Sequence, residues 1–560
     1  MPQSGHAHPG SGYLSGVLLL LACTNSGTAV IGALPEDTSV EVPPVEDTAP
    51  PEEVLGAAEV GACSSLYDPE VLQAFELELP DGVWADLEDD FAAGRKDYHP
   101  AVFRHGEVER DVQVRLKGNP NFSWISDKFQ FVISFNEDDP DGRYEGVRKI
   151  ALDSSWYEPT LLRDRLAWTL LRRIEDMPAA CANNATLDID GVYYGLYANI
   201  EYFDREYLER NWGKAYADGT LWKYGTEAKT NEGQSDSTLA RRFGTGSLSA
   251  LEDIGDVGQW VRGWAAEGVL GNDDGYWCCA HNFYLYEHPT RGILFANWDL
   301  DDAWDVTPYD LDPRDGYGMG MYGANAWKRV MADEAWRARH LDEVEMLAEA
   351  WDGEELVSLV EAWSSTNASA FEADPSRSVG WQEHLDAIEN FKVYLVQRDH
   401  FLDSWVRCER GDTEDLDGDG YGPCEDKDDT NAALNPGAVE VCNGLDDDGN
   451  TLIDDGADCD RCLRKDFFTR QLLFCDDPHG WASALQSCER QDATLFTPST
   501  TADVYLTYFY TWPNFEDWFV TEEGETGQGT CPTWSPTRTN WNSVDCDSEQ
   551  PFICSIDQAG

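Results

Sequence analysis

Residues 272–304 read NDDGYWCCAHNFYLYEHPTRGILFANWDLDDAW, and this stretch decides how the rest of the chain is interpreted. It opens with a pair of aspartates that ends at Asp274, passes through an apolar run that follows Asn282, and closes on Asp299 and Asp301. Carboxylates and an amide at strand ends suit Mg²⁺ held against phosphate oxygens, because hard cations prefer oxygen ligands. A surface hairpin with acidic ends fits the same residues equally well.

The composition indicates several folded domains with an acidic surface. The chain has 560 residues, which is too long for one ordinary core, and its 22 tryptophans are ample for packed interiors. With 106 acidic against 40 basic residues, the formal net charge is -66. Such a chain repels nucleic-acid phosphate and anionic lipid, so neither is expected as a general partner.

The first residues predict export from the cytoplasm. The apolar run at residues 14–23 is too short to span a bilayer and has the length of a signal-peptide core. Its end, LLAC at residues 20–23, resembles a bacterial lipobox, which implies cleavage before Cys23 and a lipid on its thiol. Residues 1–13 depart from that pattern because they contain no Lys or Arg, and a buried strand with a core cysteine is the alternative. Fifteen cysteines also favour an oxidising compartment.

We therefore expect an extracytoplasmic protein, lipid-anchored to a bacterial membrane or cell surface, with membrane contact only through Cys23. We expect a signal peptide with lipobox over residues 1–23 and a disordered Pro-rich acidic tether over residues 24–61. A first folded domain follows over residues 66–408, then an acidic calcium-binding repeat over 409–460 and a small C-terminal domain over 461–560.

Hydrophobic periodicity predicts the elements of the first folded domain. Alternation of apolar and polar residues predicts strands over residues 75–80, 112–116 and 128–133 and a hairpin over 191–201. Helical spacing of apolar residues predicts helices over 83–91 and 161–174. A turn at residues 117–121 carries a glycine, which permits close approach of the backbone to a ligand.

Seven short motifs along this domain, together with a helix ending near Trp405, resemble the CotH (spore-coat protein H) kinase family. They are Arg115 to Asn119, Lys128-Phe129, Leu162-Arg163 to Arg172, Gly195-Leu196-Tyr197 to Glu201, Gly219 to Lys223, Asn282 to Tyr286 and Trp298 to Asp301. The resemblance implies an atypical protein-kinase-like fold of two lobes, with ATP and Mg²⁺ or Mn²⁺ between them and a protein as phosphoryl acceptor.

The resemblance also implies roles for individual residues. Lys117, Gly118 and Asn119 would form the phosphate turn, Lys128 would contact phosphate, and Glu201 would lie at the hinge beside adenine. Asp274 would be the catalytic base, Asn282 a metal-side amide, Asp299 the principal Mg²⁺ ligand and Asp301 its support. The chain departs from ordinary kinases, because it contains no H-R-D, G-x-G-x-x-G or D-F-G motif.

Simpler roles exist for several of these residues. Lys128 also fits a strand-edge lysine, and Glu201 also fits a cap on the following helix. His281 has no partner evident in the sequence and is expected at the surface. Cys278 and Cys279 are adjacent, and we expect each to pair with a separate cysteine and so to fasten this loop.

The acidic repeat predicts calcium binding. Asp415, Asp417 and Asp419 occupy every second position, Gly420 falls at the sixth position for the sharp turn, and Asp426 falls at the twelfth, as in an EF-type loop. Tyr421 would add its carbonyl oxygen, and a second, looser ligand set comprises Asp446, Asp448, Asn450 and Asp454. Residues 428–448 resemble a bacterial putative metal-binding repeat. Acidic solvation without Ca²⁺ is the alternative.

The C-terminal region from residue 467 resembles a C-type lectin-like domain, in its Trp481-to-Cys488 helix, its Asn540-Trp541-Asn542 segment and its closing Pro551-Phe552-Ile553-Cys554. The resemblance implies a small disulfide-bonded α+β domain with pairs Cys488–Cys554 and Cys531–Cys546, and with Cys475 and Cys462 as a further candidate pair. The Glu-Pro-Asn type of sugar loop is missing, which puts calcium-dependent sugar binding in doubt.

The sequence thus predicts an α+β multidomain protein and leaves two functions open. The first is an extracytoplasmic kinase that phosphorylates a protein. The second is a non-catalytic surface protein that contacts a cell-surface glycan or protein through a lectin-like tip stiffened by Ca²⁺.

Overall fold

The computed structural model describes residues 61–120, 124–125, 128–231, 238–304, 308–314, 325–439 and 447–449, and the strands between residues 462 and 557 with residues 488 and 496. The predicted lipobox and tether lie outside the described residues. No helix in the described part of the chain is long and apolar enough to cross a membrane.

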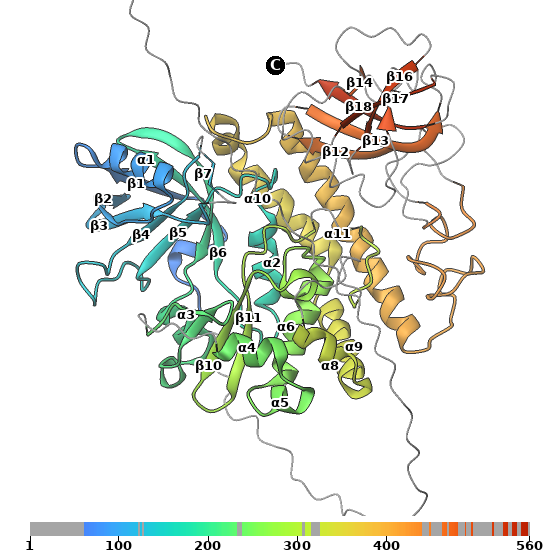
Figure 1. Ribbon diagram of the computed structural model, residues 1–560, viewed down its shortest axis with the longest axis horizontal. Coiled ribbons are helices and arrows are strands. Elements are labelled where there is room, and N and C mark those ends of the chain that lie inside the picture. The colour runs from blue at the N-terminus through green and yellow to red at the C-terminus, as the bar shows by residue number, and fades with distance from the viewer. Residues whose placement is uncertain are drawn as a thin grey trace, which may run out of the picture. The chain divides into compact units, whose positions relative to one another are not determined.

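A closed barrel of seven strands forms the first half of the described chain (Figure 1). The strands run around the barrel in the order β1-β2-β3-β4-β5-β7-β6, and β1 closes it by pairing in parallel with β6. Their bounds are β1 Gln73–Glu78, β2 His99–His105, β3 Val108–Leu116, β4 Phe131–Ser134, β5 Lys149–Asp153, β6 Ala182–Ile189 and β7 Val192–Glu201. One helix, α1 (Val83–Ala93), connects β1 to β2.

Alternating side chains fill this barrel. In β1, Phe75 and Leu77 point inward and are at most 2% exposed, while Ala74 and Glu78 are exposed and Glu76 is half-buried. Phe103 of β2 and Phe131 of β4 join the same core, so strands far apart in sequence share one apolar interior. The predicted strands at residues 75–80 and 112–116 and the helix at 83–91 are confirmed within a few residues. The strand predicted at residues 128–133 is β4, which begins at Phe131, so Lys128 lies three residues before it.

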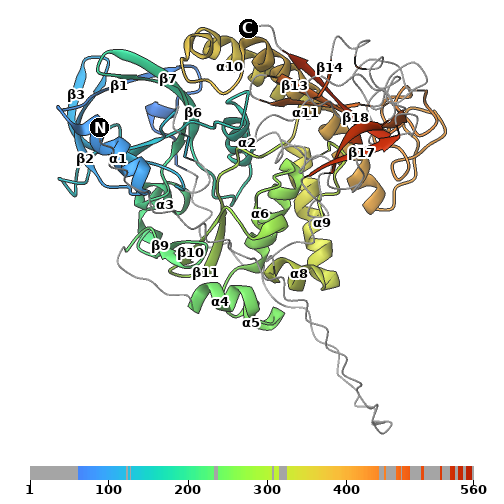
Figure 2. The ribbon, with the colours of Figure 1, turned by 45° about the horizontal axis from the view of Figure 1, so that its top comes forward.

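A smaller sheet and most of the helices form the second half of this region. The sheet has the order β11-β10-β8-β9, with bounds β8 Leu221–Lys223, β9 Glu227–Ala228, β10 Phe283–His288 and β11 Gly292–Asn297. The helices are α3 Arg205–Trp212, α4 Thr238–Thr245, α5 Leu248–Glu252, α6 Val257–Leu270, α7 Tyr276–Cys279, α8 Asn325–Met331, α9 Glu334–Glu349, α10 Gly353–Ala373 and α11 Trp381–Glu409. Helix α6 packs against β11 and α9, and α10 packs along α11 (Figure 2).

Helix α2 (Arg163–Leu171) lies where the barrel meets the helices, because it contacts β6, β7 and α10. Leu166 and Trp168 of α2 are buried in a core that also contains Leu395 of α11. The resemblance implied a sheet with one helix above a helical lobe. The structure has a closed barrel in place of an open sheet, and the division into two kinase lobes stays a prediction.

The C-terminal strands form a separate seven-stranded sheet of order β12-β13-β18-β15-β16-β17, with β14 paired to β18. Their bounds are β12 Cys462–Phe467, β13 Arg470–His479, β14 Thr494–Leu495, β15 Trp518–Phe519, β16 Thr530–Ser535, β17 Asn540–Asp545 and β18 Gln550–Asp557. Cys462 lies opposite Cys475 in the β12–β13 register, and Cys488 is disulfide-bonded.

Three disulfides join cysteines within the described part of the barrel and helical region. Cys63 pairs with Cys181 across 118 residues, and Cys408 pairs with Cys424 beyond the end of α11. Cys278 pairs with Cys279. The expectation that these two adjacent cysteines take separate partners is therefore wrong, because both lie in the single turn of α7 with no other cysteine bonded to them.

Candidate functional site

Lys117 and Asp153 form an ion pair at the ends of two barrel strands. Lys117 follows β3, Asp153 ends β5, and the Lys117 ammonium donates to Oδ2 of Asp153. Oδ1 of Asp153 accepts from the backbone N–H of Ser155 at 2.9 Å. Although burial lowers the pKa of Lys117, the negative charges of Asp153, Asp299 and Asp301 raise it above its usual value, so this ammonium stays charged.

Asp164 brings a further carboxylate to this group from α2. Its Oδ1 accepts from the N–H of Leu300 at 3.3 Å, which ties α2 to the segment after β11. Burial, then the charges of Asp299 and Asp153, raises the pKa of Asp164 to about 8. The positive charge of Lys117 opposes this shift, so the ammonium partly offsets the repulsion among the carboxylates.

Asp299 and Asp301 complete the group. Burial raises the pKa of Asp299. The positive charge of Lys117 lowers this pKa, and the negative charge of Asp153 raises it further. Burial and then the charge of Asp299 raise the pKa of Asp301 well above its usual range. We call Asp153, Asp164, Asp299 and Asp301 the cleft carboxylates. Their oxygens suit Mg²⁺ or Mn²⁺ by ligand type.

Two lysines flank the indole of Trp298 beside these carboxylates. The ammonium groups of Lys117 and Lys223 each lie 5.7 Å from the centre of the Trp298 ring. Lys223 ends β8, so one cation comes from the barrel and the other from the small sheet. This arrangement places two positive charges next to the cleft carboxylates.

Asp274 is held by two neighbours on one of its oxygens. Oδ2 accepts from the Asn282 side-chain amide at 2.9 Å and lies 2.9 Å from Nδ1 of His281. The hydroxyl of Tyr224 lies 3.1 Å from Nε2 of the same imidazole. His281 therefore has a partner that sequence reasoning did not find, and its hydrogen bond to Asp274, then that carboxylate's charge, raises the pKa of the imidazole despite burial.

Glu267 of α6 supports the loop that carries Asp274. Its fully buried carboxylate accepts from the backbone N–H groups of Tyr276 at 3.1 Å and Trp277 at 2.7 Å, and from the Asn297 amide at 3.1 Å. Burial raises the pKa of Glu267 to about 8. A Cβ at Gly275 would lie 2.8 Å from this carboxyl group, so the close approach requires glycine.

Strained backbone marks the same place. Ser155 and Tyr224 have φ values of 40° and 53°, in the left-handed region that such residues seldom adopt, and Asn282 and Asp299, whose residue types enter this region more readily, have values of 42° and 56°. Residues are held in such conformations mostly at functional sites, where surrounding contacts fix them. All four adjoin the carboxylates and lysines described above.

The other predicted site residues lie in different surroundings. Lys128 donates to Asp374 at 2.6 Å and to the carbonyl of Leu196 at 2.7 Å, so its hydrogen bonds go to residues outside the cleft carboxylates. Asp153 is nevertheless close enough for its charge to act on the Lys128 ammonium. Glu201 accepts from Arg210 and from the N–H of Cys181 at 2.9 Å. Helix α3 is capped by Asp204 rather than by Glu201.

The predicted phosphate turn follows β3. Gly118 has a φ of 88°, which glycine adopts readily, and Asn119 beside it is exposed. The carbonyl of Lys117 accepts from the Trp124 indole at 2.5 Å, which holds the start of the turn.

Sequence reasoning missed Asp153, Asp164, Lys223, Tyr224 and Glu267. Asp153 had one usable signal, since it ends a predictable apolar strand, KIALD at residues 149–153. Asp164 sits among arginines in a helix and has no local signal, because only the tertiary fold brings it to Asp299.

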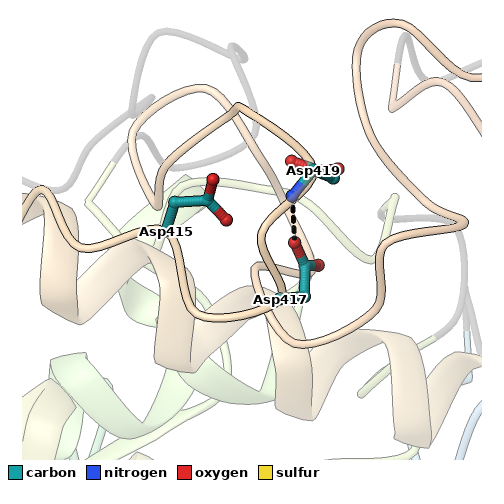
Figure 3. A group of neighbouring side chains, drawn as sticks. All are labelled: Asp415, Asp417 and Asp419. Carbon is teal, nitrogen blue, oxygen red and sulfur yellow. Dashed lines mark hydrogen bonds between the residues drawn. The ribbon is translucent and has the colours of Figure 1, made fainter.

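The acidic repeat gathers a second set of carboxylates. Oxygens of Asp415, Asp417 and Asp419 lie within 4.8 Å of one another, as do oxygens of Asp417, Asp426 and Asp429. Figure 3 shows the first three on one loop, with the N–H of Asp419 bonded to Asp417. Asp429 was not among the predicted ligands. Asp446, Asn450 and Asp454 lie outside the described residues, and Asp448 lies in the short described segment 447–449.

This loop has unsatisfied oxygens that a cation would satisfy. Oδ2 atoms of Asp417, Asp419 and Asp426 are buried without a hydrogen-bond partner. Burial, then the charges of Asp419 and Asp417, raises the pKa of Asp426 to about 6. The Cys408–Cys424 disulfide fastens the loop to the end of α11.

A family model for CotH kinase protein matches residues 114–402, just over half of the chain. The chain belongs to the CotH kinase protein family. The match includes Lys117, the cleft carboxylates and Asp274, so the whole of this site lies inside the CotH domain. No curated protein matches.

Solved structures with similarity to parts of the chain include the snake venom toxin convulxin, an SPL-1–GlcNAc complex and botrocetin, at 12%, 19% and 14% identity. They cover 17%, 18% and 17% of this chain and 96%, 98% and 96% of their own chains, with TM-scores of 0.16, 0.16 and 0.15. Scores this low establish no shared fold, and the lectin-like domain stays a prediction.

Proposed function

We propose that the CotH domain binds ATP with Mg²⁺ or Mn²⁺ and transfers the γ-phosphoryl group to a hydroxyl of a protein. The observation that carries this proposal is the cleft carboxylate group, set beside Lys117, Lys223 and Asp274 in the family-matched region. Carboxylates for a metal, cations for phosphate and a carboxylate base are the parts that phosphoryl transfer needs.

The metal would be held by Asp299 with Asp301, and by Asn282 on the side of Asp274. A bound divalent cation supplies charge neutralisation to phosphate oxygens. Lys117 and Lys223, each 5.7 Å from the ring centre of Trp298, would contact the phosphates. Lys117 thereby takes the role first expected of Lys128, whose ammonium is used by Asp374. Glu201 would lie at the hinge beside adenine, and its carboxylate accepts from Arg210 at 2.9 Å.

Asp274 would act as the general base. Its Oδ2 is occupied by Asn282 and His281, which leaves Oδ1 to accept the proton of the acceptor hydroxyl. The acceptor oxygen then forms a bond to the γ-phosphorus as the bond to the β-phosphate oxygen breaks. Because two neighbours hold the carboxylate in place, the base is aligned with the acceptor hydroxyl before the reaction, and this alignment raises the rate.

Transfer of labelled phosphate from ATP tests the proposal. The full-length protein with Mg²⁺ or Mn²⁺ should label itself or an added protein, and Asp299→Ala and Asp274→Asn should lose the label. Asp403→Ala, at an exposed position of α11, is the matched control and should retain it. No transfer by wild-type protein with either metal would leave the non-catalytic surface protein as the better account.

We further propose that the acidic repeat binds Ca²⁺ through Asp415, Asp417, Asp419, Asp426 and the carbonyl of Tyr421, with Asp429 as an added ligand. The buried, unpartnered oxygens of Asp417, Asp419 and Asp426 support this site. The ion would stiffen the segment after α11, which otherwise repels itself. Calorimetric titration of Ca²⁺ into wild type and Asp417→Asn tests this; equal heats in the two proteins contradict it.

Export and lipid attachment at Cys23 complete the proposal. The disulfides Cys63–Cys181 and Cys408–Cys424 support an oxidising compartment. Metabolic labelling with a fatty acid, lost in Cys23→Ser, is the corresponding test.

A further inference from the structure

A short segment, residues 308–314, contacts both the acidic repeat and helix α11. The ammonium of Lys427 in the acidic repeat forms an ion pair with the carboxylate of Asp310. On either side of Asp310, the carbonyls of Tyr309 and Leu311 accept hydrogen bonds from Arg398 of α11 at 2.7 Å and 2.6 Å. We call residues 308–314 the bridging segment.

Arg398 also binds the end of helix α6. Its guanidinium is fully buried and donates to the carbonyl of Gly268 at 2.7 Å and to that of Val269 at 3.1 Å. A Cβ at Gly268 would lie 2.2 Å from the carbonyl oxygen of Pro313, so the bridging segment packs directly on the backbone of α6. A displacement of the bridging segment would therefore disturb the last turn of α6.

The last turn of α6 holds two parts of the proposed phosphotransferase site. The N–H of Trp304, three residues after Asp301, donates to the carbonyl of Leu270 at 3.1 Å. Asn272 follows α6, and its side-chain oxygen accepts from the N–H of Asp274 at 3.3 Å. The end of α6 thus positions both the loop that carries Asp274 and the segment that follows the metal-binding aspartates.

The position of Lys427 depends on the carboxylates of the acidic repeat, because Lys427 directly follows Asp426. Asp426 is 2% exposed, and its Oδ2 is buried with no hydrogen-bond partner among the described residues. One of its oxygens lies within 4.8 Å of oxygens of Asp417 and Asp429, and Asp426 lines the same pocket as Tyr309. Without a cation, repulsion among these carboxylates favours their separation, which would move Lys427 away from the bridging segment.

We propose that Ca²⁺ bound at the acidic repeat raises the affinity of the CotH domain for ATP with its metal, through the bridging segment and the end of α6. This inference rests on the proposed phosphotransferase and on the proposed Ca²⁺ site, and it adds their coupling. Ca²⁺ favours the state in which Lys427 pairs with Asp310 and the end of α6 is held, and ATP favours the same state. By linkage, each ligand must strengthen binding of the other by the same factor.

Calorimetric titration of the full-length protein tests the coupling. With Mg²⁺ in excess, Kd for ATP should be about tenfold lower in the presence of Ca²⁺ than after its removal by a calcium-selective chelator, and Kd for Ca²⁺ should fall by the same factor when ATP is present. Asp310→Asn should bind both ligands and lose this mutual effect. Glu355→Gln removes a carboxylate that pairs with Arg173 outside the bridging segment, and should retain the effect.

Amide hydrogen exchange over residues 266–274 gives a measurement that does not depend on ATP. Ca²⁺ should slow this exchange in wild type and in Glu355→Gln, and should leave it unchanged in Asp310→Asn. Equal Kd values for ATP with and without Ca²⁺ overturn the inference and leave both proposed functions standing, and so does a mutual effect that persists in Asp310→Asn. Slower exchange with Ca²⁺ in a protein that binds no ATP would uphold the connection to α6 and contradict the phosphotransferase.

Discussion

Lys128 donates a hydrogen bond of 2.6 Å to Asp374, which lies 246 residues further along the chain. Lys128 is 2% exposed and Asp374 is fully buried. Asp374 also accepts from the N–H of Leu196 at 2.8 Å, so one carboxylate joins the α10–α11 connection to β7 and to Lys128, three residues before β4. This buried pair fastens the barrel to the helices that complete the site.

Removal of one partner of this pair should therefore be costly. Asp374→Ala leaves the Lys128 ammonium buried without its counter-ion, and we expect a loss of about 3–5 kcal/mol in the free energy of unfolding. Urea denaturation measures it. Asp403→Ala on the exposed face of α11 should change the value by less than about 0.5 kcal/mol. A comparably small loss for Asp374→Ala would show that the pair does not join the two parts.

His281 should position Asp274 rather than bind substrate. Its bond to Oδ2 is a hydrogen bond to a charged group, so His281→Ala should lower kcat about tenfold with little change in KM for ATP. His281→Gln retains a donor and should recover part of the rate. A rise in KM for ATP with kcat unchanged would instead place His281 in nucleotide binding.

Glu267 makes stability depend on pH. Its pKa is raised from 4.5 to about 8 in the folded protein, so the folded state binds more protons than the unfolded state between these values. Stability contributed by the neutral carboxyl group is therefore lost as pH rises from about 4.5 to about 8. Glu267→Gln should make the thermal midpoint less dependent on pH across this window, whereas Glu354→Gln at an exposed site of α10 should leave that dependence unchanged. An unaltered slope in Glu267→Gln would contradict this assignment.

Calcium should stabilise the acidic repeat and bind less tightly in acid. Removal of Ca²⁺ by a chelator should lower the thermal midpoint, because at 100 times Kd a bound ligand adds about 2.7 kcal/mol. Because the pKa of Asp426 is raised to about 6, protonation should compete with the ion below that pH. Asp426→Asn should weaken binding at pH 7 and reduce the dependence on pH. Midpoints that do not respond to the chelator would favour simple acidic solvation.

The sequence predicts those parts of the fold and site whose signals are local. Alternation gives β1 and β3, and the Asp415–Asp419 spacing gives a loop whose oxygens do converge. Lys128 shows the limit, since nothing near it in sequence indicates that Asp374 will take its ammonium. Asp164 is equally unpredictable, because its hydrogen-bond partner Leu300 lies 136 residues away in the sequence. Closure of the barrel by β1 and β6 is likewise a long-range pairing without a local pattern.

If the cleft carboxylates and their two lysines form a metal–nucleotide site, calorimetric titration of ATP should detect it. Wild-type protein should bind ATP in the presence of Mg²⁺ or Mn²⁺ and not with a chelator, and Asp299→Asn should lose the metal-dependent part while Asp403→Asn keeps it. Binding of ATP by Asp299→Asn as tight as wild type, or no metal-dependent binding by wild type, would contradict the account.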